Sequence, residues 1–105
     1  MKIELLYFSD CPSWENAFVN LRDAAALEGL TTPIELVEVL NDEDAARRQF
    51  LGSPSILVDG RDLWPESRNA YYMSCRMYPT PDGIRGWPTR EMIRKQLRAL
   101  ASRVP

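Results

Sequence analysis

The chain has 105 residues, 45% of them hydrophobic and 27% charged, which fits a single globular domain over residues 1–105 with an ordinary core. Its net charge of −2 excludes the basic surface on which most nucleic-acid binding depends, and no apolar run reaches the roughly 20 residues of a membrane helix. With no histidine and only two cysteines, we expect no metal, no resident cofactor and no disulfide scaffold, and the composition favours the cytosol.

The first predicted element is a strand over residues 3–8, which are apolar with β-branched and aromatic members. Cys11 and Pro12 follow it closely. Because proline is disfavoured inside a central strand but suits the first position of a helix, a helix is predicted to start at Pro12, with Cys11 near its N-cap. Apolar residues then recur at helical spacing, and Gly29 is expected to end the helix.

A second strand is predicted over residues 34–40, IELVEVL. Its near-continuous apolarity is typical of a strand in a sheet that is covered on both faces. A short helix is expected next, because Asn41 or Asp42 can cap it, acids fill its first turn and arginines its last. Gly52 is expected to end this helix.

The rest of the chain predicts two more strands and a final helix. Residues 55–58 predict a third strand, and residues 61–74 an ordered excursion rich in proline, serine, asparagine and aromatics. A short fourth strand is predicted over residues 75–78, CRMY, followed by a turn-rich connection. Residues 89–101 predict an amphipathic helix with one apolar and one arginine-rich face. This alternation predicts an α/β sandwich.

Cys11 is the residue with the clearest chemical potential. Unpaired backbone N–H groups and the helix dipole at a helix N-terminus stabilise a thiolate, which is the reactive form of cysteine. Asp10 opposes this effect, because a neighbouring anion favours the neutral thiol. The plain alternative is a buried cysteine that packs as a small hydrophobic residue.

Ser53 and Pro54 stand directly before the third predicted strand. A proline at this place is either an ordinary trans residue that opens a strand or part of a cis bond, which about 5–6% of X-Pro bonds adopt. The residues alone leave both alternatives open.

Together, residues 10–14, DCPSW, and residues 52–56, GSPSI, in their order of strands and helices, resemble the thioredoxin-like superfamily over nearly the whole chain. The resemblance implies a three-layer α/β/α sandwich whose four-stranded mixed sheet has the order 4-3-1-2, with strand 3 antiparallel. It implies that Cys11 is the nucleophile and that the Ser53–Pro54 bond is cis. It also implies that the backbone of Ser53 receives an extended substrate, with Pro12 and Trp14 close by.

The motif departs from the family at Trp14, which stands where a CxxC motif has its resolving cysteine. A one-cysteine protein that works through glutathione is therefore implied, or one that has lost redox turnover. Packing over the first helical turn is the simpler role for Trp14. Cys75 is the remaining candidate for a resolving thiol. On a fourth strand beside the third, it would lie roughly 10 Å or more from Cys11, whereas a disulfide needs Cα atoms within about 7 Å.

A second resemblance covers residues 52–62 and 74–88, which are similar to small bacterial thioredoxin-family proteins that are often labelled alkylmercury lyases. Cleavage of an organomercurial requires paired thiolates and a proton-donating acid around one mercury. The sequence brings only Cys11 and Asp10 together, so it gives no warrant for mercury chemistry.

Thiol–disulfide exchange at Cys11 is the leading functional hypothesis, with protein or small-molecule thiols and disulfides as partners and glutathione as a candidate co-substrate. The alternative is a redox-inactive thioredoxin-like module that binds an extended peptide or a partner protein. Arg47 and Arg48 could bind the carboxylates of glutathione or complement the helix dipole. The aromatic residues of the excursion could pad the sheet or line a homodimer contact; they are Trp64, Tyr71 and Tyr72.

Overall fold

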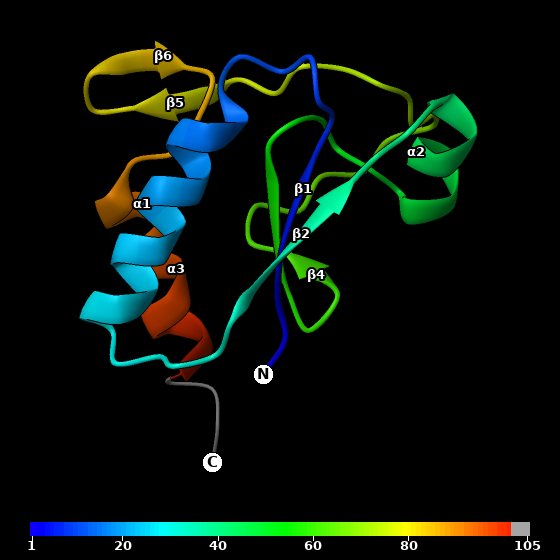
Figure 1. Cartoon of the computed structure of the whole chain (residues 1–105). Coiled ribbons are helices and arrows are strands. Elements are labelled where there is room, and N and C mark those ends of the chain that lie inside the picture. Colours follow the sequence, from blue (N-terminus) through cyan, green and yellow to red (C-terminus); the bar gives the residue numbers. More distant parts are fainter. Residues whose placement is uncertain (102–105) are drawn as a thin grey trace.

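Strand β1 (Ile3–Tyr7) lies in the middle of a four-stranded mixed sheet (Figure 1). The structure is a computed structural model and describes residues 1–101. Parallel β2 (Ile34–Glu38) flanks β1 on one side and antiparallel β3 (Ser55–Val58) on the other, while β4 (Arg61–Asp62) pairs antiparallel with β3. The order is therefore β2-β1-β3-β4. The prediction of an α/β domain is confirmed.

Three helices pack against this sheet within the described residues. Helices α1 (Trp14–Leu27) and α3 (Arg90–Ala101) lie side by side on one face, and α2 (Asp42–Arg48) lies on the other (Figure 1). Buried side chains of the larger core, under α1 and α3, include Ile3, Leu5, Ala17, Leu21, Ile56, Ile93 and Leu97. Those of the smaller core, under α2, are Leu6, Val39, Ala45 and Phe50. Because neighbouring residues of a strand face opposite sides, β1 contributes to both cores.

Helices cover both faces of the sheet, as predicted, but the second strand is only partly buried because β2 is an edge strand. Ile34 packs against the larger core and Val37 against the smaller one. Leu36, on the same face as Ile34, is 45% exposed, and Leu40, just beyond the strand, is 68% exposed. Helices α1 and α3 therefore do not cover this edge of the sheet completely. The apolar run over residues 34–40 therefore does not mark a fully buried strand.

The prediction that the fourth strand covers residues 75–78 is wrong. The strand next to β3 is β4, at Arg61–Asp62. The chain reverses at once after β3, through a turn in which Gly60 has a φ of +82°. Residues that follow the excursion return to the start of β3. They then form a separate hairpin of β5 (Tyr78–Thr80) and β6 (Gly83–Arg85).

The start of α2 agrees with the prediction from the sequence, but its end does not. Asn41 caps the helix, since its side-chain oxygen accepts a hydrogen bond from the N–H of Asp44 at 2.8 Å. The helix ends at Arg48, with Gln49 as its C-cap, rather than at Gly52. Gln49 adopts a left-handed conformation with a φ of +53°, which a non-glycine residue rarely does. Residues 50–52 therefore lie outside the helix and connect it to Ser53.

Glu28, at the end of α1, ties this helix to α3. Its carboxylate accepts hydrogen bonds from Nε of Arg98 at 2.9 Å and from Nε of Arg94 at 2.7 Å. These two bonds hold the pKa of Glu28 below its ordinary value, and the bond from Arg98 has the larger effect. Because the pKa is lower in the folded than in the unfolded chain, the two ion pairs stabilise the fold only while Glu28 is ionised.

We therefore predict that replacement Glu28→Gln lowers the free energy of unfolding at pH 7. The difference from the parent chain should persist above the ordinary pKa of 4.5 and shrink as the pH falls through the lowered value, because the parent carboxylate is then protonated too. Urea unfolding at pH 7 and at pH 3 checks this. A difference that is equal at both pH values would contradict the role of the two ion pairs.

Candidate functional site

Cys11 and Ser53, which are 42 positions apart, meet at one edge of the sheet. The S–H of Cys11 points to the carbonyl oxygen of Ser53, with the sulfur 3.7 Å from it. The N–H of Phe8 donates to Oγ of Ser53 at 3.3 Å, and the N–H of Cys11 closes a turn onto the carbonyl of Phe8 at 3.0 Å. The loop after β1 is thus bound to the residue that precedes Pro54.

The peptide bond between Ser53 and Pro54 is cis, as the resemblance implies. Both residues are buried. The carbonyl oxygen of Pro54 accepts a hydrogen bond from the hydroxyl of Tyr78 at 2.5 Å. Burial raises the pKa of Tyr78 far above its ordinary value, so its hydroxyl stays protonated and keeps donating this bond.

The first helix begins later than predicted. Its first residue is Trp14 and its N-cap is Ser13, whose carbonyl accepts the first helical bond, from Ala17 at 3.3 Å. Cys11 therefore precedes the N-cap by two residues, and Pro12 is an exposed residue of the connecting turn. Since the influence of a helix dipole falls off within the first turn, Cys11 receives less of it than the sequence led us to expect.

Trp14 has a packing role in this structure. Its ring stacks on Tyr7, with ring centroids 4.3 Å apart and an angle of 26° between the planes. It also lies against the larger core. The ring of Trp14 is thus held by Tyr7 and by the core.

Cys75 lies beside the site and not on the far side of the sheet, because residues 74–76 run next to the start of β3. We call this segment the strap. Cys75 forms a parallel bridge with Ser53. The N–H of Ser53 donates to the carbonyl of Ser74 at 2.8 Å, and the N–H of Arg76 donates to the carbonyl of Ser53 at 3.0 Å. The strap therefore occupies both backbone polar groups of Ser53, which the resemblance assigns to a substrate.

The two thiols differ sharply in exposure. Both cysteines lie within the described residues and both are free, but Cys11 is only 4% exposed, whereas Cys75 is exposed. The sequence did not predict this contrast. The strap, which is bound to Ser53 beside Cys11, turns its own cysteine to solvent.

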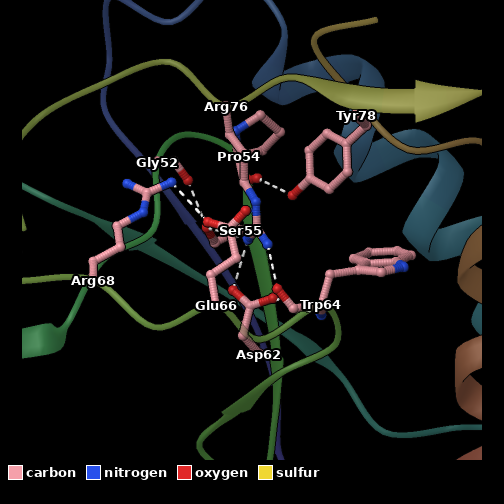
Figure 2. A network of polar contacts seen from close by, with 9 residues as sticks. All are labelled: Gly52, Pro54, Ser55, Asp62, Trp64, Glu66, Arg68, Arg76 and Tyr78. Atoms are coloured by element: carbon pink, nitrogen blue, oxygen red, sulfur yellow. Dashed lines mark hydrogen bonds and ion pairs between the residues drawn. The ribbon is translucent and has the colours of Figure 1, made fainter. Parts of the chain in front are cut away.

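Arg76 anchors the strap, and the sequence did not single it out. Its guanidinium group is buried and donates to Oδ2 of Asp62 at 2.7 Å and to the carbonyl of Trp64 at 2.6 Å (Figure 2). It donates also to Oγ of Ser55 at 3.1 Å, and it lies 5.0 Å from the ring centroid of Tyr78. Every side of the buried cation thus has a partner.

Arg76 stays protonated and positively charged at every accessible pH. Burial by itself would lower the pKa of Arg76, but the acidic groups around it, Tyr78, Asp62 and Glu66, raise the pKa above its ordinary value. The only signal in the sequence was the alternation of Cys75, Arg76, Met77 and Tyr78. It places Arg76 and Tyr78 on one side of the segment and Cys75 on the other.

Gly52 is what lets the strap come so close. Its φ is +117°, which favours glycine, and a Cβ atom at this position would lie 2.9 Å from Cβ of Arg76. No side chain fits there unless the strap moves. The glycine that was predicted to end a helix thus serves the contact with the strap.

The two arginines that could have held glutathione have internal partners. Nε of Arg48 donates to Oδ1 of Asp44 at 3.0 Å, and Arg47 donates to the same oxygen. The backbone N–H of Leu40 also donates to Asp44, and together these bonds hold the pKa of Asp44 below its ordinary value. Arg47 and Arg48 therefore bind the last turn of α2 to Asp44 in its first turn.

Comparisons with known proteins do not assign the chain to a family. Scans of protein-family models, curated proteins and solved structures gave no match. Within residues 1–101, no helix is both long and apolar enough to cross a membrane. The same part of the chain brings no three His, Cys, Asp or Glu side chains together in a group that could hold a metal ion.

The buried ion pair of Arg76 gives a prediction for stability. Replacement Arg76→Met should lower the free energy of unfolding by about 3 kcal/mol, because it leaves Asp62 in a largely buried place without its cation. Urea unfolding measures this. The matched control is Arg90→Met, which removes an exposed arginine and should change stability by about 0.5 kcal/mol or less. Equal effects of the two replacements would show that Arg76 is not an anchor.

The close approach at Gly52 predicts the accessibility of Cys11. In a Cys75→Ser background, Gly52→Ala should speed the alkylation of Cys11 by iodoacetamide, because the new methyl group displaces the strap. A loss of about 1.4 kcal/mol in strap docking would give a tenfold faster reaction. Gly60→Ala is the control, since Gly60 also has a positive φ but has nothing within 4 Å of an added Cβ. Equal rates in the two variants would contradict the displacement.

Proposed function

We propose that the chain is a thioredoxin-like thiol–disulfide exchange protein in which Cys11 is the nucleophile. The observation that carries the proposal is the contact of Cys11 with the carbonyl of Ser53, which places a lone thiol against the turn before β3. The sheet order, with antiparallel β3 beside a central β1 that is followed by a helix, supports the thioredoxin-like assignment.

The chemistry follows from the residues around the sulfur. A thiolate attacks a disulfide through a mixed-disulfide intermediate, and the rate depends on access to the attacking sulfur. Trp14 is not a thiol, so any second sulfur has to come from another segment or from a small thiol such as glutathione. A cytosolic setting, in which glutathione keeps thiols reduced, fits two free cysteines.

A second candidate function is supported by the closed state of the site. Cys11 is shielded and the backbone groups of Ser53 are in use, as in a redox-inactive module. A mostly apolar groove of about 470 Å³ lies beside the strap and could receive side chains of a bound peptide or partner protein. Its lining includes Leu63, Trp64, Met77, Tyr78, Pro79 and Met92, together with the charged Glu66 and Arg76. This binding module is the alternative that a redox assay has to exclude.

The test is catalysis of exchange between glutathione and a fluorescent glutathione disulfide. The parent chain should accelerate the exchange, and Cys11→Ser should return it to the uncatalysed rate, because the replacement removes the attacking sulfur. Urea unfolding of Cys11→Ser serves as the folding control, and we expect a loss of about 1 kcal/mol. If the parent chain gives no acceleration, the redox proposal fails and the binding module is favoured. If Cys11→Ser retains the acceleration, Cys11 is not the required nucleophile and the proposal fails in that respect.

A further inference from the structure

We infer that Cys75 is the thiol that meets an external disulfide, and that Cys11 then attacks the mixed disulfide formed on Cys75. This inference rests on the proposed function, since it keeps Cys11 as a nucleophile. It adds a second residue to the reaction and names what Cys11 attacks. Cys75 thus supplies the second thiol that is missing from the motif at Trp14, and Cys11 takes the resolving role.

Exposure decides which of the two thiols an external disulfide meets. Attack requires the sulfur to approach along the S–S bond, so it depends on access. Cys11 is 4% exposed, whereas Cys75 is exposed on the strap. In the closed structure, only Cys75 can reach a disulfide whose two halves are large.

Ser53 brings the two thiols into the same place. Its carbonyl oxygen accepts from the S–H of Cys11 at 3.7 Å and from the N–H of Arg76 at 3.0 Å. That N–H belongs to the peptide group that joins Cys75 to Arg76, so Ser53 adjoins both cysteines. Ser53 and Cys75 are bridged residues, which face each other across roughly 4.8 Å. The inference requires the Cα atoms of Cys11 and Cys75, which share this neighbour, to come within the roughly 7 Å of a disulfide.

The strap, and Cys75 with it, is held firmly beside Ser53. Arg76 follows Cys75 directly, and its buried guanidinium group is bound to Asp62 and Trp64 (Figure 2). Holding two reacting groups in place makes their reaction effectively unimolecular and favours it over attack by a thiol from solution. Release of the bound partner is therefore expected to be internal.

The reaction has two disulfide-exchange steps. The Cys75 thiolate attacks an external disulfide R–S–S–R′; a Cys75–S–S–R bond forms, the S–S bond of the substrate breaks, and R′–S⁻ leaves and takes up a proton. The Cys11 thiolate attacks the sulfur of Cys75; the Cys11–Cys75 bond forms and R–S⁻ leaves and is protonated. The external disulfide is reduced by two electrons to two thiols, and the two cysteines are oxidised to one disulfide.

The test uses a limiting amount of dithiobisnitrobenzoate, an aromatic disulfide whose halves leave as coloured thiolates. The parent chain should release two coloured thiolates for each reagent molecule consumed, because Cys11 displaces the half that Cys75 has captured. Intact mass should show a chain that has lost two hydrogen atoms and carries no adduct. Peptide mapping should find the Cys11–Cys75 disulfide.

Two variants separate the steps. Cys11→Ser should release one coloured thiolate and keep a stable adduct on Cys75, at an initial rate within about twofold of the parent, because the first step does not need Cys11. Cys75→Ser should react at least about tenfold more slowly, because only the shielded thiol remains. Urea unfolding checks that both variants are folded.

Two results would overturn the inference. One is a parent chain that releases a single coloured thiolate and keeps the adduct on Cys75. The other is a Cys75→Ser chain that captures the reagent on Cys11 as fast as the parent chain reacts. Neither touches the proposed function, which stands as long as the glutathione exchange assay depends on Cys11. Loss of catalysis in that assay would be a separate failure, of the proposed function itself.

Discussion

The hydrogen bonds of Ser53 determine the geometry of the site, because they join three segments that are distant in the sequence. Its hydroxyl binds the loop after β1 through Phe8, its N–H binds the strap through Ser74, and its carbonyl accepts from both Arg76 and Cys11. Ser53 is buried, so each of these groups would cost free energy if it lost its partner. No segment can move without leaving such a group unpaired.

The buried arginine gives the strap a second, independent attachment. A cation in this place is tolerated only when its partners replace water, and Arg76 has a carboxylate, a hydroxyl, a carbonyl and an aromatic ring around it. The same segment turns Cys75 outward because neighbouring residues of an extended chain face opposite sides. Shielding of one thiol and exposure of the other are thus two results of a single arrangement.

Local patterns in the sequence were enough to predict the regular elements that rely on nearby residues. The apolar run of β1, the cap at Asn41 and the amphipathic pattern of the last helix all have local causes, and the structure agrees with them. The contact between Cys11 and Ser53 needed the family resemblance, because no local signal joins residues that are 42 positions apart.

The remaining features of the site could not be predicted from local patterns. The path of the strap depends on where a buried Arg76 finds Asp62, and a lone arginine near a cysteine gives no sign of burial. The fourth strand was placed at residues 75–78 because a two-residue strand such as β4 has no periodicity to detect. The end of α2 was missed because Gln49 takes a conformation that is usual for glycine.

The ion pair between Asp62 and Arg76 also closes the excursion into a ring, since everything between these two residues is tethered at both ends. The entropy of closing such a ring changes only slowly with its length. Insertions or deletions within it should therefore cost the sheet little, provided that the two charged ends stay in place. The surface around the outer thiol can then diversify between related chains while the inner thiol keeps its setting.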